Sequence, residues 1–228
     1  MGEHTLAGRR GAPERNRRWR RVGVVAGLLA SSVIVWQSTS ATFNSVTSND
    51  TNTFGAGSVI ITDNDGGSAA MFTAATMAPG DTATVCMGVK YSGSLTPTAI
   101  KVYTTGAQEA NNGGAYGAWA NDATSEMDDN LSMQIQVSSA DLAADPGSNC
   151  APAGVGSFTD VAAAAPGTNM QTMINTNKDY ATGFNSQWGT VVANQWRVFK
   201  FKYTFASAAP TTAQGDGLKV NFVWEAQR

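Results

Sequence analysis

The stretch that decides the fold is Gln195–Phe205, which reads QWRVFKFKYTF. Successive side chains of a β-strand point to opposite faces, so positions two residues apart share a face. One face carries Arg197, Phe199, Phe201, Tyr203 and Phe205. The other carries Trp196, Val198, Lys200, Lys202 and Thr204. The nearly continuous aromatic face predicts a strand that packs on a core, with the lysine face directed to solvent.

Working outward from this stretch, β-branched and alternating runs separated by turn residues recur along the chain. Leu131–Val137 (LSMQIQV) alternates almost without exception, and Pro79-Gly80-Asp81 is a turn that precedes a longer run. The strand-like runs are Ser58–Thr62, Ala70–Thr73, Thr82–Tyr91, Thr98–Thr104, Leu131–Val137 and Leu218–Trp224. Several short strands with Gly- and Pro-bearing turns are typical of a sandwich or a jelly roll.

Long segments rich in Gly, Ala, Asn and Asp separate these strands. Gly106–Asn130 and Ala140–Ala165 are predicted to be loops, with a short helix near Ala162–Ala165. Met170–Ile174 and Tyr180–Trp188 fit more than one structure. Because no stretch keeps a long helical period, we expect an all-β jelly-roll or β-sandwich domain over residues 54–228, with long loops and few short helices.

The first 41 residues have the composition of a secretory signal peptide. Seven arginines lie between Arg9 and Arg21, the run Val22–Trp36 carries no charge, and small residues follow up to Ala41. Positive, apolar and small segments in this order predict export and cleavage, after Ala41 or after Ser40. An uncleaved N-terminal anchor is the alternative. We therefore expect a secreted protein at the cell surface or outside the cell, with no membrane association after cleavage.

Removing this leader changes the charge of the chain. Of 15 basic and 17 acidic residues, seven basic and two acidic ones precede Val22, which leaves 8 basic and 15 acidic residues and a net charge of −7. Binding to nucleic acid needs a basic surface that neutralises phosphates, so nucleic acid is not an expected partner. About 187 residues suit a single all-β domain.

The chain has two cysteines, Cys86 in a strand-like run and Cys150 in a loop-like stretch. In an oxidising compartment an even number of cysteines favours a disulfide, which here would tie the long loop to the sheet. Two free thiols are the alternative. A zinc site would need more cysteine or histidine than these two residues and His4 provide.

The expected mature chain lacks histidine, which excludes a Ser-His-Asp triad and a Cys-His dyad. A glycosidase needs only two carboxylates, and the acid pairs Asp63/Asp65 and Asp128/Asp129 provide them. Both pairs lie in turn-like clusters, where Asp is favoured for its geometry. Asp63-Asn64-Asp65-Gly66 begins like a calcium loop but lacks the later ligands. We predict neither an enzyme nor a cofactor, and Asp63 and Asp65 are a weak calcium candidate.

Aromatic residues in predicted loops are a further candidate site. Tyr116, Trp119 and Trp188 lie outside the strand-like runs and could stack on sugars. Aromatic residues in such loops more commonly plug the ends of a sandwich core. A monomeric secreted adhesin or glycan-binding module is therefore an alternative function, and a hydrolase that uses the acid pairs is a third one.

The junction between the leader and the domain resembles the start of the TasA/camelysin family. The family motifs are a small residue followed by Phe-Asn, then Phe-x-Ala-Gly before a strand, and they match Thr42-Phe43-Asn44 and Phe54-x-Ala56-Gly57. The Pro79-Gly80-Asp81 turn and the closing strand Val220–Trp224 are also similar. The resemblance covers both ends of the expected mature chain and leaves about Gly106–Trp188 unassigned. These are secreted proteins processed by a dedicated signal peptidase, and many build biofilm fibres.

This resemblance implies a homopolymer assembled by donor-strand exchange, in which an N-terminal segment of one subunit completes a sheet of the next. The donor would be residues 42–53, with Thr42, Phe43, Asn44 and Val46 in the pairing segment; other matrix components are possible partners. The segment is too polar to found a core but can pair through its backbone. The alternative is that it folds back onto its own domain as an ordinary first strand.

Overall fold

We describe a computed structural model of the chain, which covers residues 44–47, 61–64, 77–121, 127–213 and 215–228. The chain divides into two units, Met1–Thr42 and Phe43–Arg228, and all described residues belong to the second. The predicted strand Ala70–Thr73 and the first three residues of Ser58–Thr62 lie outside the described residues.

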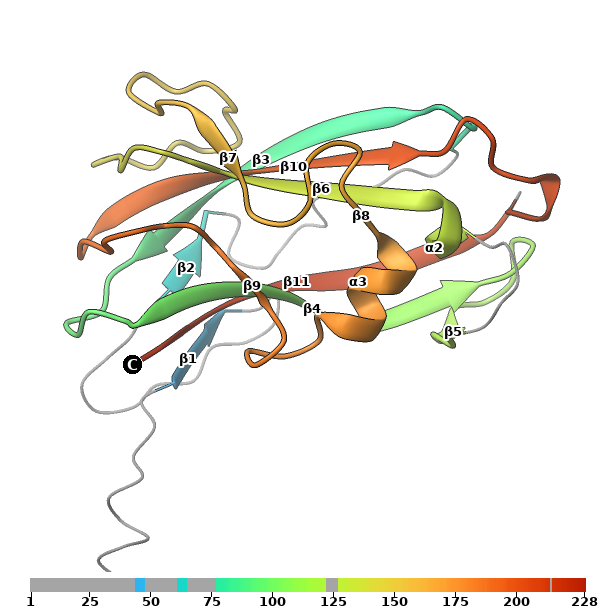
Figure 1. Cartoon of the computed structure of the whole chain (residues 1–228), viewed down its shortest axis with the longest axis horizontal. Helices are drawn as coiled ribbons and strands as arrows, with labels where there is room; N and C mark the ends of the chain where they lie inside the picture. Colours follow the sequence, from blue (N-terminus) through green and yellow to red (C-terminus); the bar gives the residue numbers. More distant parts are fainter. Residues whose placement is uncertain (1–43, 48–60, 65–76, 122–126, 214) are drawn as a thin grey trace, which may run out of the picture. The chain divides into compact units, whose positions relative to one another are not determined.

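Two antiparallel sheets make up the described part of the domain (Figure 1). Sheet A has the order β1-β11-β4-β5, with β9 also paired to β4, and sheet B has the order β2-β3-β10-β6-β7, with β8 also paired to β6. The strands of sheet A are β1 (Asn44–Thr47), β4 (Ala99–Ala110), β5 (Gly117–Ala118), β9 (Phe184–Asn185) and β11 (Gly217–Gln227). Those of sheet B are β2 (Ile61–Asp63), β3 (Thr82–Tyr91), β6 (Leu131–Ser138), β7 (Phe158–Asp160), β8 (Thr168–Asn169) and β10 (Gln195–Phe205).

Helices are few and short among the described residues: α2 (Met127–Asn130), α3 (Met170–Thr176) and the 3-10 turn η1 (Thr211–Ala213). The ambiguous segment Met170–Ile174 is therefore helical, and its N-cap is Asn169, whose side chain accepts a hydrogen bond from the backbone of Thr172 at 3.1 Å. The short helix expected near Ala162–Ala165 is absent, because this segment is an irregular loop.

The core lies between the two sheets, as the aromatic residues on one face of β10 indicated. Phe199 and Phe201 are fully buried, and Phe201 contacts Phe222 and Trp224 of β11 at centroid distances of 5.0 and 5.7 Å. Each such aromatic side chain contributes roughly 1.5–3 kcal/mol through burial. The strand content and this packing confirm an all-β sandwich. The jelly-roll topology remains a prediction.

The opposite face of β10 is partly covered, which sequence alternation did not predict. Val198 has no exposed surface although it shares a face with Lys200, because a loop returns over that end of the sheet. Leu142 of this loop forms an isolated β-bridge with Trp196. Arg197 is buried and forms a salt bridge with Asp141 at 2.6 Å, so this charge is neutralised at the edge of the core.

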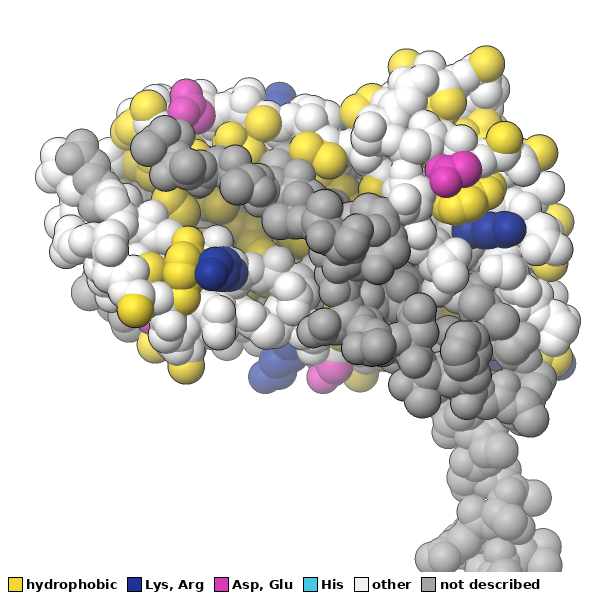
Figure 2. Space-filling model, turned by 180° about the vertical axis from the view of Figure 1, so that it is seen from behind, with side chains coloured by type: hydrophobic (Ala, Val, Ile, Leu, Met, Phe, Trp, Pro, Cys, Tyr) yellow, Lys and Arg dark blue, Asp and Glu magenta, His cyan; other side chains and the backbone are white. Residues whose placement is uncertain are grey.

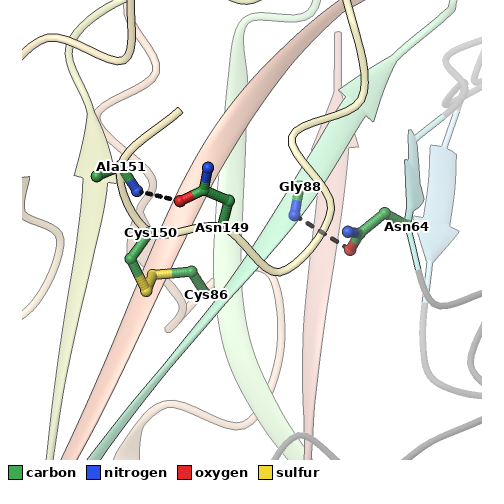
Figure 3. Close-up of a disulfide and its surroundings, with 6 residues drawn as sticks. All are labelled: Asn64, Cys86, Gly88, Asn149, Cys150 and Ala151. Carbon is green, nitrogen blue, oxygen red and sulfur yellow. Dashed lines mark hydrogen bonds between the residues drawn. A yellow bond between two sulfur atoms is a disulfide. The ribbon is translucent and has the colours of Figure 1, made fainter. Parts of the chain in front are cut away.

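The predicted disulfide between Cys86 and Cys150 is present and links β3 to the same loop (Figure 3). The two cysteines are 64 residues apart in the sequence. Beside the disulfide, a Cβ on Gly88 would lie 2.6 Å from the ring of Pro146, so only glycine allows the loop to approach β3 this closely. The bridge and this contact hold the long loop on the outer face of sheet B.

Candidate functional site

The described part of the predicted donor segment forms β1, at the edge of sheet A. Its four residues pair with the end of β11, from Asn44 opposite Gln227 to Thr47 opposite Trp224. Val46 lies opposite Glu225. Thr42, Phe43 and residues 48–53 lie outside the described residues. The pairing matches the alternative in which the segment folds back onto its own domain, and it also defines the register that an exchanged strand would reuse.

The backbone of β4 shows which groups of β11 point to β1. The N–H of Thr104 donates to the carbonyl oxygen of Asn177 at 2.8 Å, on the side of β4 that faces away from β11. Backbone groups of successive residues alternate sides, so Tyr103 bonds to its partner Val223 in β11. By the same alternation, the N–H and C=O of Trp224 point to the outer edge, where β1 pairs.

The outer edge of β3 is paired at one end of the strand and has no described strand partner at the other end. The backbone N–H of Asn64 donates to the carbonyl oxygen of Gly88 at 3.1 Å. The N–H of Gly88 donates to Oδ1 of Asn64, also at 3.1 Å (Figure 3). Among the described residues, β2 pairs with β3 only at Val89–Tyr91. Asn64 therefore ends this pairing by satisfying Gly88 with its own side chain. Over Thr82–Met87, no described strand pairs with β3 on this side.

Together these edges form a seam between the sheets, which we define as the outer edges of β3 and β11. At one end β1 and β2 pair with the edges and contact each other. At the other end, Gly217–Val223 of β11 pairs only with β4 among the described strands. Leu218 and Val220 are half-buried there and pack against the core. Hydrophobic side chains are visible in a hollow on this side of the molecule (Figure 2).

The residue of β11 opposite Val46 is a buried carboxylate, Glu225, which sequence analysis did not single out. Glu225 is 4% exposed, accepts a hydrogen bond from the hydroxyl of Tyr103 at 2.7 Å, and accepts another from Nε2 of Gln227 at 2.7 Å. Burial and then the hydrogen bond to Glu225 raise the pKa of Tyr103 well above its ordinary value of 10.0. This network fixes the last residues of β11, to which β1 pairs.

The predicted acid pairs do not form a catalytic or metal centre in the described part of the chain. Asp128 lies in α2, is 5% exposed, and accepts a hydrogen bond from the indole N–H of Trp119 at 2.7 Å. Asp63 ends β2, and Asp65 lies outside the described residues. No group of three or more His, Cys, Asp or Glu side chains of the described residues is placed to hold a metal ion. Asp128 thus anchors a loop.

The loop aromatics were candidates either for stacking on sugars or for plugging the ends of the core. Trp188 is 2% exposed, donates to Oδ1 of Asp141 at 3.2 Å and packs near Phe199, so it plugs the core, the more common arrangement, and does not offer its ring to a sugar. Trp119 is half-buried against the core. Tyr116 is 42% exposed, with the ammonium of Lys219 over its ring at 3.8 Å. Trp188 and Trp119 thus cover the core, as aromatic residues at the ends of a sandwich commonly do.

A scan against protein-family models finds no match to this chain, and a search of the curated proteins finds no significant match. Among the residues that the structure describes, no helix has the length and apolar character needed to cross a membrane. The candidate site is the seam, with the pairing of β1 with β11 as its principal contact.

Proposed function

We propose that the chain is a structural subunit of an extracellular or cell-surface filament, in which the segment that forms β1 pairs with β11 of the neighbouring copy. One observation carries this proposal. The first described strand is a four-residue edge strand whose sheet partner is the last strand of the domain. A strand held in this way can leave its own sheet and pair in the same register with a second copy.

The energy of the contact fits exchange. Each backbone hydrogen bond contributes about 0.5–1.5 kcal/mol net, so a four-residue pairing contributes only a few kcal/mol. Exchange remakes the same bonds between two copies, and its net cost is therefore small. A head-to-tail contact of this type does not close on itself and generates filaments rather than rings. An unblocked strand edge is the surface that supports such addition.

The location outside the cell belongs to the same proposal. It rests on the secretory pattern of residues 1–41, the net acidic remainder, and the resemblance of the junction to the TasA/camelysin family. The Cys86–Cys150 disulfide is compatible with an oxidising, extracellular environment. Cleavage near Ala41 frees the segment that leads into β1, so assembly would follow export. The partner is a second copy of the chain, and other matrix components are further partners.

A matched pair of proline variants tests this function in residues 42–228. Ser45 lies opposite Ala226, whose backbone points to β1, so Ser45→Pro removes an N–H from the pairing. Val46 points the other way, and Val46→Pro keeps every pairing bond. We expect filaments in electron micrographs of the parent and Val46→Pro chains, and monomers for Ser45→Pro with an unchanged circular dichroism spectrum. Filaments of Ser45→Pro, or of a chain lacking residues 42–51, would contradict the proposal.

A monomeric adhesin or glycan-binding module remains the alternative function. Three loop aromatics suggested this alternative. Trp188 is buried and the indole of Trp119 is held by its hydrogen bond to Asp128, which leaves Tyr116 as the exposed ring among the three. Glycan binding by a persistently monomeric chain, lost on Tyr116→Ala, would favour this alternative over the filament.

A further inference from the structure

The outer face of sheet B carries a regular array of polar side chains. Three cross-strand rows run over β3, β10 and β6, and the middle residue of each row belongs to β10. The rows are Thr82–Thr204–Ser132, Thr84–Lys202–Gln134 and Cys86–Lys200–Gln136. Alternate positions of the same strands form the core, so these side chains lie on the outside. We call the residues of these three rows, apart from Cys86 itself, the lysine face.

The lysine face is positively charged within an acidic domain. It holds two lysines and no acidic residue, whereas residues 22–228 contain 15 acidic and 8 basic residues. Neither Lys200 nor Lys202 forms an ion pair with a described residue. The ammonium of Lys200 lies 4.2 Å from the ring centroid of Phe158. These two charges are therefore not neutralised within the described part of the molecule.

Asp160 of β7, the register partner of Gln136, is a carboxylate at the border of the lysine face and partly offsets its positive charge. Asp160 accepts hydrogen bonds on Oδ1 from Nε2 of Gln134 at 2.7 Å and from Nε2 of Gln136 at 2.9 Å. These bonds hold both amides in place beside the lysines. The two Thr side chains contributed by β3, Thr82 and Thr84, are exposed. The face thus combines two cations, the half-buried amide of Gln136, the buried amide of Gln134, and the exposed hydroxyl groups of Thr82 and Thr84.

We propose that the lysine face binds an acidic polysaccharide, a polymer of sugars that carry carboxylate groups. The lysines would pair with the carboxylates, and the hydroxyl and amide groups would bond to sugar hydroxyls. Nucleic acid is a poorer fit, because two lysines neutralise few phosphates and the domain is acidic overall. A protein partner is also a poorer fit, since the face lacks the exposed Trp, Tyr or Arg anchors that dominate protein interfaces. This inference does not depend on filament assembly.

Binding is measured with the Ser45→Pro form of residues 42–228, in which filament assembly is expected to be lost. A failure of polysaccharide binding in this form can then be told apart from a failure of filament assembly. The probes are polygalacturonate and its uncharged methyl ester. We expect saturable binding to polygalacturonate that weakens with added salt, and much weaker binding to the ester. Lys200→Gln/Lys202→Gln should lower the affinity about tenfold, because both ion pairs to the carboxylates of the polymer are lost. Thr84→Lys, which extends the row of Lys202, should raise it.

The matched control removes the same charge elsewhere. Lys178 and Lys219 are exposed and lie outside the lysine face, so Lys178→Gln/Lys219→Gln should change the affinity by less than about twofold. Equal losses in the two double variants would overturn the proposal, because binding would then follow net charge alone. Absence of binding by the parent, or equally tight binding of the methyl ester or of a DNA duplex, would also overturn it.

Discussion

The two ends of the seam between the sheets differ in what completes their edges. At the closed end, β1 pairs with Trp224–Gln227 of β11 and β2 pairs with Val89–Tyr91 of β3. At the open end, the outer edges of Thr82–Met87 and Gly217–Val223 have no strand partner among the described residues. The strands that complete the closed end have four and three residues, whereas β3, β10 and β11 have ten or eleven.

We propose that this difference separates the strands that fold the domain from the strands that join its copies. The core depends on the long strands, whose aromatic side chains pack between the sheets. The closing strands add few hydrogen bonds, so they can dissociate without unfolding the core. We therefore expect changes in the long strands to alter stability, and changes at the closed end to alter assembly.

The largest expected effect comes from the disulfide, which anchors β3 where its edge changes from open to closed. Replacing both Cys86 and Cys150 by Ser should lower the free energy of unfolding by about 4 kcal/mol, because the bridge closes a loop of 64 residues. Urea denaturation measures the change. Filaments should still form below the unfolding transition, since neither cysteine lies on the β11 edge. A loss below 1 kcal/mol would show that the loop holds without the bridge.

The next effect concerns the buried pair under the closed end. Tyr103→Phe leaves Glu225 with one fewer donor and should cost about 1–3 kcal/mol at neutral pH. Because the folded state raises the pKa of Tyr103, its contribution is present below pH 10 and is lost as pH rises above 10. The melting temperature of the parent should therefore fall more steeply above pH 10 than that of the variant.

The exposed residue Tyr116 provides the control for that comparison. Tyr116→Phe should change stability by less than about 0.5 kcal/mol at neutral pH. Identical alkaline profiles for the parent and Tyr103→Phe would argue against a stabilising hydrogen bond from the hydroxyl of Tyr103 to Glu225.

The smallest effect tests the end of β2. Asn64→Ala removes the side-chain acceptor of the Gly88 N–H and should cost about 1 kcal/mol, with faster amide hydrogen exchange at Gly88. Asn149→Ala is the matched control, since Asn149 accepts from the backbone of Ala151 in an exposed loop (Figure 3). Equal protection of Gly88 in parent and Asn64→Ala chains would mean that Asn64 does not end the pairing of β2.

The sequence allowed the fold class and the disulfide to be predicted, because alternation within a strand and paired cysteines are local signals. The extension of β4 to Ala110 was missed, since its last residues lie in a Gly- and Ala-rich stretch. The burial of Trp188 and Val198 was missed as well. The burial of these two side chains depends on loops that return to the sheets from distant parts of the chain. The periodicity of side chains within one strand does not predict such contacts.

The candidate site was predictable only in part. The polar segment after the expected cleavage point indicated a pairing strand, and Asn44 and Val46 do lie in β1. Its partner β11 was not foreseen, because strand order across a sheet depends on contacts between the two ends of the chain. Glu225 follows the predicted strand Leu218–Trp224, and an acidic residue at such a position is ordinarily solvent-exposed.

A pair of cysteines at the closed end tests the central claim most directly. Asn44 and Gln227 are register partners whose backbone groups point away from each other, which brings their Cβ atoms close. Residues 42–228 carrying Asn44→Cys and Gln227→Cys are assembled, oxidised and run on a denaturing gel without reductant. Strand exchange predicts a ladder of covalently linked dimers, trimers and longer species, all collapsing to monomer with reductant. A single monomer band, with the new cysteines bridged inside each chain, would contradict it.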